Sequence, residues 1–143
     1  SQNINMAFIR FENNSMGAGF LSNGKIIRGF NNYAGELGLI PAGEHESLDF
    51  IVNSALEPEQ YAETVANLLA WISCILNPKY ITLGGPDFKK ECLGLISDRI
   101  EKILPGNMVP EVLYSGYVWH DYLEGMAHLT AEQIFQDILL IEE

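Results

Sequence analysis

The fold is decided by residues 4–27, which read INMAFIRFENNSMGAGFLSNGKII. Apolar side chains alternate loosely over residues 4–12, as in a strand that buries one face. A second apolar run ends at Leu21, and a third begins after Asn23-Gly24. Because Asn-Gly between two apolar runs is a strong hairpin signal, the stretch predicts three antiparallel strands joined by short turns.

Downstream of this meander, the sequence predicts a loop and then helices that alternate with strands. The mostly polar residues 30–58 predict a loop insertion, in which residues 48–52 form one short turn or strand. Helical spacing follows over 59–76 and ends at Asn77-Pro78. The other predicted elements are a strand at 80–83, a helix at 88–103 with Asp87 as its N-cap, a strand at 109–114 and a helix at 121–141.

The predicted order of elements is βββαβαβα, within one α/β domain that covers residues 1–143. Three antiparallel strands followed by alternating helices and parallel strands build a mixed five-stranded sheet with helices on both faces. This layout is typical of one lobe of the ribonuclease-H-like proteins, the group that includes the actin- and hexokinase-like ATPases.

Charge and cysteine content narrow the class of protein further. The 143 residues carry 8 basic and 19 acidic side chains, so nucleic acid and anionic membranes are repelled by the net charge of −11. We therefore expect no direct nucleic-acid contact and no membrane binding by this chain. Cys74 and Cys92 are the only cysteines, and each lies in an apolar helical pattern, which favours a reducing, cytoplasmic location over a disulfide framework.

Three segments that contain glycine are candidates for binding chemistry. Residues 14–20 lie at the predicted bend between the first two strands, where small residues let amides approach a phosphate, although a plain turn uses the same residues. Gly84-Gly85 follow a predicted parallel strand, at the end of the sheet where α/β proteins bind ligands. A plain turn from the strand into the next helix is the alternative. Glu36 lies between Gly35 and Gly38, and its two carboxylate oxygens can accept hydrogen bonds from adjacent hydroxyls of a sugar. The alternative is an acidic side chain in a loop that contacts only solvent.

Six short motifs follow one another along most of the chain. They are Gly17-Ala18-Gly19, Asn23-Gly24-Lys25, Arg28-Gly29, Ala34-Gly35-Glu36-Leu37-Gly38, Leu76-Asn77-Pro78 and Ile81-Thr82-Leu83-Gly84-Gly85. Their order and spacing resemble the carboxyl-terminal lobe of the ROK family, which contains sugar kinases and sugar-responsive, NagC-like transcriptional repressors. Each motif is loose by itself, and the resemblance rests on their shared order.

The resemblance implies one half of a two-lobed, hexokinase-like protein, with sugar between the lobes and nucleotide phosphates over the glycine turns. By this resemblance, Glu36 binds sugar hydroxyls. The positions that the resemblance assigns to the nucleotide are Asn14, Gly17, Gly19, Gly84 and Gly85.

The chain departs from the family pattern at the phosphate turn and at the metal site. The family's turn is Gly-Thr-Gly, whereas residues 13–15 are Asn-Asn-Ser. The chain therefore lacks the threonine hydroxyl and the two glycines, whose missing side chains leave room for a phosphate. The family's histidine after the Gly-Glu-x-Gly turn, which serves sugar and zinc, is Leu39, and residues 40–58 hold no cysteine. Because zinc needs about four ligands, we expect no zinc site, and ATP with magnesium only if the chain is a kinase lobe.

Three hypotheses follow: the sugar-sensing lobe of a transcriptional regulator, a lobe of an ATP-dependent sugar kinase, and a degenerate dimerisation domain. The resemblance places the kinases' catalytic aspartate in the other lobe, and without that base nothing here takes a proton from a sugar hydroxyl. We therefore favour a regulatory domain that binds a monosaccharide or a sugar phosphate. The helix over 59–76 is apolar nearly all round, which favours a homo-oligomer or contact with an amino-terminal lobe.

Overall fold

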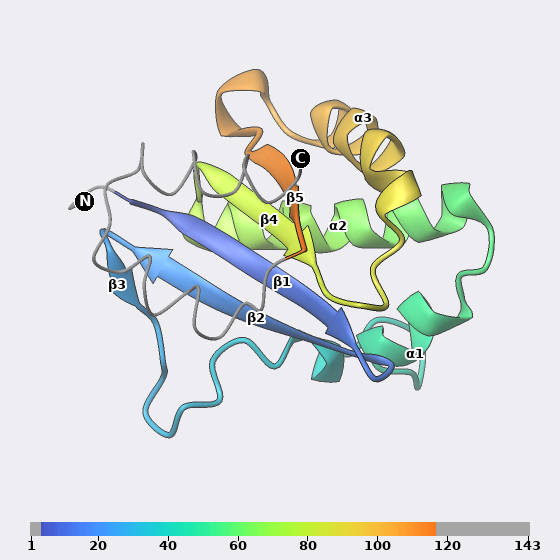
Figure 1. Cartoon of the computed structure of the whole chain (residues 1–143), viewed down its shortest axis with the longest axis horizontal. Coiled ribbons are helices and arrows are strands. Elements are labelled where there is room, and N and C mark those ends of the chain that lie inside the picture. The colour runs from blue at the N-terminus through green and yellow to red at the C-terminus, as the bar shows by residue number, and fades with distance from the viewer. Residues whose placement is uncertain (1–3, 117–143) are drawn as a thin grey trace.

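The computed structural model describes residues 4–116 and contains a single mixed sheet (Figure 1). Its five strands lie in the order β3-β2-β1-β4-β5. The strands are β1 (Met6–Glu12), β2 (Ser15–Ser22), β3 (Lys25–Ile26), β4 (Tyr80–Gly84) and β5 (Glu111–Ser115). The helices are α1 (Leu48–Ser54), α2 (Pro58–Leu76) and α3 (Leu93–Ile103), with 3₁₀ turns η1 (Leu37–Leu39), η2 (Lys90–Cys92) and η3 (Gly106–Met108).

The predicted meander and the parallel strands are both present. β1 pairs antiparallel with β2 and parallel with β4, so that Ile9 lies between Ala18 and Leu83 in one row of the sheet. β2 continues antiparallel into β3 through the Asn23-Gly24 turn, where both residues have positive φ, as a two-residue hairpin turn requires. The mixed five-stranded sheet predicted from the order of elements is confirmed.

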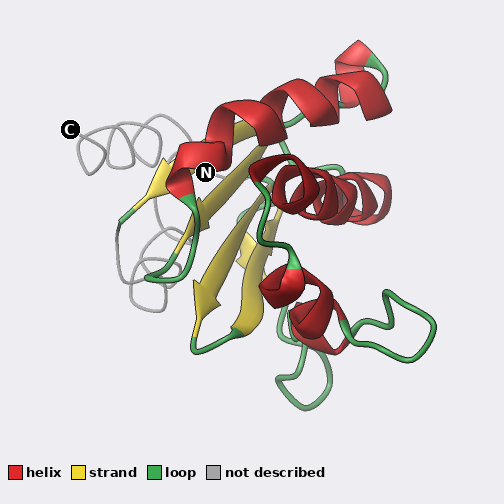
Figure 2. Cartoon of the chain, turned by 90° about the vertical axis from the view of Figure 1, so that its right-hand side faces the viewer, coloured by secondary structure: helices red, strands yellow, loops and turns green. Residues whose placement is uncertain are grey.

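The described helices all pack on one face of the sheet (Figure 2). Side chains of Ala7, Ile9 and Phe11 point from β1 into this layer and join one apolar core with α1, α2 and α3. Met6 and Phe8 alternate with them, so they belong to the opposite face, and both are buried. The last predicted helix, at 121–141, lies outside the described residues.

Helix α2 is the central element of the helical layer, and its bounds agree with the predicted 59–76. Pro58 occupies its first turn, where the missing N–H costs nothing. Asn77 ends it in the left-handed conformation with φ 49°, and Pro78 prevents the helix from continuing. Buried residues lie on several sides of α2, because it packs against both the sheet and α3.

The segment expected as a loop insertion, residues 30–58, differs from that expectation. Residues 48–54 form helix α1 instead of a short turn or strand. The Ser47 hydroxyl accepts a hydrogen bond from the Phe50 N–H and caps the helix, and Leu48 and Val52, one turn apart, are both buried. The cap and the i,i+4 pair are visible in the sequence, but the helix is short and is decided by burial against α2.

The helix predicted over 88–103 begins later than expected. Residues 90–92 form the 3₁₀ turn η2, and the α-helix starts at Leu93. Asp87 is not its N-cap, because the carboxylate of Asp87 faces the hairpin between β1 and β2. The ring of Phe88 is drawn into the core against Phe11, which holds this stretch as an irregular connection.

No helix among residues 4–116 combines the length and the apolar character that a membrane span requires.

Candidate functional site

The hairpin between β1 and β2 forms one end of the sheet, and its turn consists of Asn13 and Asn14. Both asparagines have positive φ, 54° and 59°. Asparagine tolerates this conformation better than other non-glycine residues, so the turn closes without glycine. Gly17 and Gly19 therefore lie inside β2. The prediction that they lie at the bend is wrong, whereas Asn14 does lie there.

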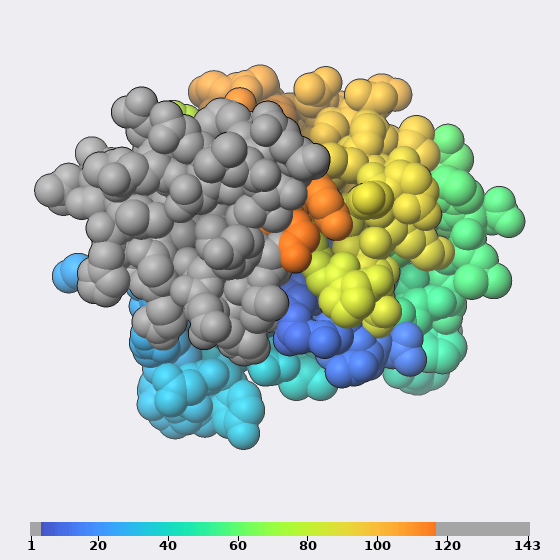
Figure 3. Space-filling model, viewed as in Figure 1, coloured from blue at the N-terminus to red at the C-terminus, as the bar shows by residue number. Residues whose placement is uncertain are grey.

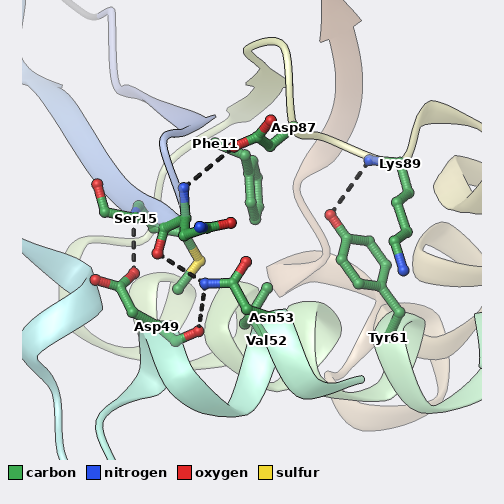
Figure 4. A pocket seen from close by; sticks show the side chains of 10 residues that line it. Phe11, Ser15, Asp49, Val52, Asn53, Tyr61, Asp87 and Lys89 are labelled. Carbon is green, nitrogen blue, oxygen red and sulfur yellow. Dashed lines mark hydrogen bonds between the residues drawn. The ribbon is translucent and has the colours of Figure 1, made fainter. Parts of the chain in front are cut away.

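Two amides at this hairpin donate to carboxylates of the same chain (Figure 4). The Asn14 N–H donates to Oδ2 of Asp87 over 3.2 Å, and the Met16 N–H donates to Oδ1 of Asp49 over 2.8 Å. The side-chain amide of Asn53 donates to the carbonyl oxygens of Asn14 and Asp49. The hairpin is thus tied to helix α1 and to the β4–η2 connection, and the backbone amides of Asn14 and Met16 have acceptors within the chain.

A small pocket lies between this hairpin and the start of α2, with a volume of about 60 Å³. Phe11, Val52 and Tyr61 form its apolar wall, and Asp49, Asp87 and Lys89 contribute polar groups. Figure 4 shows these side chains converging from β1, α1, α2 and the connection after β4. Ligand pockets for small molecules usually measure about 300–1,000 Å³, so this pocket alone holds no sugar or nucleotide.

Lys89 and Tyr61 hold the side of the pocket that is remote from the hairpin. The Lys89 N–H donates to the Tyr61 hydroxyl over 3.3 Å. The Lys89 ammonium donates to the Ala55 carbonyl and lies 4.9 Å from the centre of the Tyr61 ring. Burial raises the pKa of Tyr61 to about 12, so the phenol stays neutral at physiological pH. The ammonium is thereby engaged by a carbonyl and a ring and is held beside the apolar wall.

Several neighbouring groups act on the pKa of the Asp49 carboxyl. Burial raises the pKa of Asp49 above its ordinary value, the Met16 N–H lowers it, and the negative charge of Glu36 raises it again. Negative charge therefore gathers beside the hairpin amides. This electrostatic environment disfavours a further anion at the same position.

Glu36 lies at the outer edge of β2. The Ala18 N–H donates to the Gly35 carbonyl over 2.8 Å, so residues 34–37 continue the edge of the sheet beyond β3. Gly35 has φ 101°, and a Cβ there would overlap the carbonyl oxygen of Ala18. Glu36 is exposed and precedes η1, close enough to Asp49 to act on its charge but outside the lining of the small pocket.

The remaining predicted nucleotide positions lie in the sheet or directly after it. Gly17 and Gly84 both pair with Arg10, so they flank it in one row on the face opposite the described helices. A Cβ at Gly84 would overlap the Ser115 carbonyl, and Gly85, with φ 99°, lies against the backbone of Phe11. Close packing thus accounts for Gly84 and Gly85, whereas a Cβ at Gly17 would meet nothing within 4 Å.

The position of the family's zinc-binding histidine does not fit a metal. Leu39 is largely exposed and has no lone pair to offer. Among residues 4–116, no group of three or more histidine, cysteine, aspartate or glutamate side chains is arranged to hold a metal ion. We therefore derive no chemistry through zinc.

Several residues that build this site were not singled out from the sequence. Asp49 and Asn53 lie one turn apart on α1, in a segment that was expected to be a loop, and Tyr61 was interpreted only as part of an apolar helix face. The i,i+4 spacing of Asp49 and Asn53 behind the Ser47 cap is the signal that could have found them. Their partners in the hairpin lie more than thirty residues away along the chain.

Neither a family model nor a curated protein sequence matches the chain. Solved structures do. A ROK family protein from Streptococcus pneumoniae in complex with sucrose is 17% identical at a TM-score of 0.65, over 88% of this chain and 57% of the other. A ROK family transcriptional regulator, a homologue of the E. coli MLC protein, is 16% identical at a TM-score of 0.65, over 86% of this chain and 44% of the other. A ROK hexokinase from Thermus thermophilus is 17% identical at a TM-score of 0.63, over 93% of this chain and 58% of the other.

The sheet and its helices thus have the fold of one lobe of the actin- and hexokinase-like proteins. Within that class, the similar structures are ROK family proteins, both kinases and a regulator, so the resemblance predicted from the motifs is confirmed for the fold. The chain spans 44% to 58% of the length of these three proteins.

Proposed function

We propose that this chain is the carboxyl-terminal lobe of a ROK-type, cytoplasmic transcriptional regulator that senses a monosaccharide or a sugar phosphate and transfers no phosphoryl group. The shared fold and the ordered motifs support the family, and the similar structures include a regulator. The proposal includes an amino-terminal lobe that closes on this one, and it assigns DNA contact to another part of the protein.

The observation that carries the proposal is the occupation of the hairpin amides by Asp49 and Asp87. The family resemblance places nucleotide phosphates at this hairpin. A phosphate there would have to displace both carboxylates from their N–H donors and then meet their charges at close range. Phosphoryl transfer depends on exact positioning and charge stabilisation, so a lobe that repels the phosphate is poorly suited to it.

Sensing places weaker demands on the same fold. A sensor needs only a ligand that binds one conformation better than another. Glu36 supplies an exposed carboxylate for paired sugar hydroxyls, on a segment that is fixed to β2 by the Ala18–Gly35 hydrogen bond. Leu39, three residues further along the chain, stands where the family pattern has a histidine, so the sugar is held with fewer hydrogen bonds than in that pattern.

A kinase lobe is the second candidate, because hexokinases are among the similar structures. In that case Glu36 keeps its sugar contact, and the nucleotide lies at the positions that the resemblance assigns to it, among which Gly17 has room for an added Cβ. The two candidates therefore differ in whether ATP binds.

The test uses a longer chain that carries both lobes. We expect millimolar ATP with magnesium to leave its melting temperature unchanged, and a saturable increase would establish the kinase candidate instead. We expect a monosaccharide or its phosphate to bind, and Glu36→Gln to weaken that binding at least about tenfold in calorimetry, roughly 1.4 kcal/mol. Glu44→Gln, which neutralises a well-exposed acid on the next loop, is the matched control. Equal affinity in the Glu36 variant would remove this residue from the site.

A further inference from the structure

The turn between β2 and β3 contains the one Asn-Gly sequence of the chain, Asn23-Gly24. Asn23 is exposed with φ 51°, and Gly24 has φ 78°, so both residues lie in the left-handed region. An Asn-Gly sequence is a reactive pair, because glycine has no Cβ that would keep its backbone nitrogen away from the carboxamide of the asparagine. By sequence alone, Asn23 is therefore the asparagine most open to deamidation.

Deamidation at this turn uses no reactant except solvent water. The Gly24 nitrogen forms a bond to Cγ of Asn23 and loses its proton, while the bond from Cγ to the side-chain nitrogen breaks and ammonia leaves. Water then opens the resulting cyclic imide at either of its carbonyl carbons. The product at position 23 is an aspartate or, where the main chain comes to run through the side-chain carbon, an isoaspartate.

The segment that precedes β1 holds both backbone amides of this turn. The Gly24 N–H donates to the Ile4 carbonyl over 2.8 Å, and the Asn23 N–H donates to Oδ1 of Asn5 over 3.0 Å. Ile4 is buried, and the Asn5 carbonyl accepts from the Lys79 N–H over 2.8 Å, so the segment is itself fixed to the core and to the start of β4. Figure 1 shows the start of β1 close to β3. The reactive nitrogen is therefore held by a well-anchored part of the chain.

These two hydrogen bonds oppose the reaction at both of its requirements. The Gly24 nitrogen must give up the proton that it donates to Ile4, and the anion so formed would face the negative end of the same carbonyl dipole. The nitrogen must also rotate toward the side chain of Asn23, whereas the hydrogen-bonded turn fixes its orientation. Attack on Cγ therefore requires the turn to detach from residues 4 and 5 first, which is a local opening at the edge of the sheet.

We propose that Asn23 is a deamidation site whose rate is set by detachment of the β2–β3 turn from Ile4 and Asn5. The folded chain keeps the site in a slow state, and local opening of the turn releases it. The modification requires no ligand and is independent of the proposed sensing function.

The isoaspartate product changes the edge of the sheet. It lengthens the main chain within a two-residue turn, so the pairing of Ser22 with Lys25 loses its register. β3 has two residues and is the outermost strand of the described sheet, and the chain beyond it projects from the body of the protein, in light blue in Figure 3. We expect β3 to detach, which faster cleavage by trypsin after Lys25 under native conditions measures.

Mass spectrometry of tryptic peptides, after incubation of the 143-residue chain at mildly alkaline pH, tests the proposal. Residues 11–25 form one tryptic peptide, which contains Asn23 and, as internal references, Asn13 and Asn14. We expect Asn23 to deamidate in the folded chain at least about tenfold more slowly than in the same chain unfolded in urea, because two hydrogen bonds hold the turn.

Substitutions of Asn5 separate the role of the turn contact from that of the whole fold. Asn5→Ala removes the acceptor of the Asn23 N–H, so we expect deamidation in the folded chain to become about two- to tenfold faster, the factor of one net hydrogen bond. Asn5→Asp keeps an acceptor oxygen and is expected to keep the slow rate. Asn53→Ala is the matched control, because it also removes a hydrogen-bonded carboxamide, but at the hairpin at the other end of β2. We expect it to leave the rate at Asn23 unchanged.

Three results would overturn the proposal. Equal rates in the folded chain and in urea would mean that the fold gives Asn23 no protection. An Asn5→Ala chain that is folded by circular dichroism and reacts at the unmodified rate would mean that the contact with Asn5 does not control the site. Equal acceleration in Asn5→Ala and Asn53→Ala would mean that the reaction proceeds from the globally unfolded chain.

Discussion

The two ends of helix α2 show opposite ways of completing a surface. At its start, the hairpin amides, the Asn53 amide and the Lys89 ammonium all find partners within the chain. At its end, Trp71 and Ile75 line a groove without cover from the described residues. The first end is self-sufficient in hydrogen bonds, and the second has more apolar surface than an isolated chain needs to expose.

Charge follows the same division. Asp49, Asp87 and Glu36 gather around the hairpin, whereas residues 64–86, which include the groove wall of α2, contain no acid. The hairpin end therefore gathers carboxylates that accept hydrogen bonds from the chain's own amides, whereas the other end is apolar and carries no acid.

Gly35 joins the two ends, and its substitution has the largest expected effect. Its neighbours Ala34 and Leu37 line the groove, while Glu36 faces the charge of Asp49. In Gly35→Ala, the added Cβ would overlap the Ala18 carbonyl at φ 101°. We expect a loss of about 3 kcal/mol in the free energy of unfolding, from a left-handed alanine and a broken sheet-edge hydrogen bond, measured by urea denaturation.

Gly17→Ala provides the matched control on the neighbouring strand. A Cβ at Gly17 would meet nothing within 4 Å, and φ is not positive there. Alanine is better than glycine inside a strand by roughly 0.5–1 kcal/mol, so this variant should be as stable as the unmodified chain or slightly more stable. Equal losses in the two variants would mean that residues 34–37 do not hold the two ends together.

The sequence was sufficient to predict the sheet, because its signals are local. Asn23-Gly24 required a two-residue turn, and Asn77-Pro78 ended α2 where the apolar spacing stops. α1 was missed because seven residues form a stable helix only when tertiary burial supports them, as Val52 does here. Local patterns contain no information about such support.

The candidate site was predicted only in part, for the same physical reason. The partners of the hairpin amides are 33 and 73 residues away in the sequence, and no spacing rule connects Asp49 with Met16 or Asp87 with Asn14. The bend was predicted over residues 14–20 because small residues there would let amides approach a phosphate, whereas Asn13 and Asn14 make the turn at positive φ and β2 already begins at Ser15. The site arises from contacts that only the folded chain makes.

Asp49→Ala tests the hydrogen bonds at the hairpin end, and we expect its effect on the free energy of unfolding to be smaller than that of Gly35→Ala. The variant leaves the Met16 N–H without its acceptor, so we expect a loss of about 1–2 kcal/mol in the free energy of unfolding. Urea denaturation at neutral pH measures it. Asp98→Ala, on the exposed side of α3, is the control and should change stability by less than about 0.5 kcal/mol. A negligible loss at Asp49 would mean that water replaces this carboxylate freely.

Asp49→Asn makes the smallest and most specific change, because the amide keeps an acceptor oxygen for the Met16 N–H and removes only the charge. The pKa of Asp49 is raised in the folded chain, first by burial, so the folded state holds this proton more tightly than the unfolded state does. Ionisation of Asp49 therefore destabilises the fold as the pH rises from about 4 through the raised pKa. We expect the asparagine variant to match the unmodified chain near pH 3.5 and to exceed it by less than about 0.5 kcal/mol at pH 7, since the carboxylate is partly exposed. Urea denaturation at both pH values measures the difference. A variant that loses stability at pH 7 would show that the negative charge of Asp49 strengthens its hydrogen bond from the Met16 N–H, despite burial and the nearby Glu36.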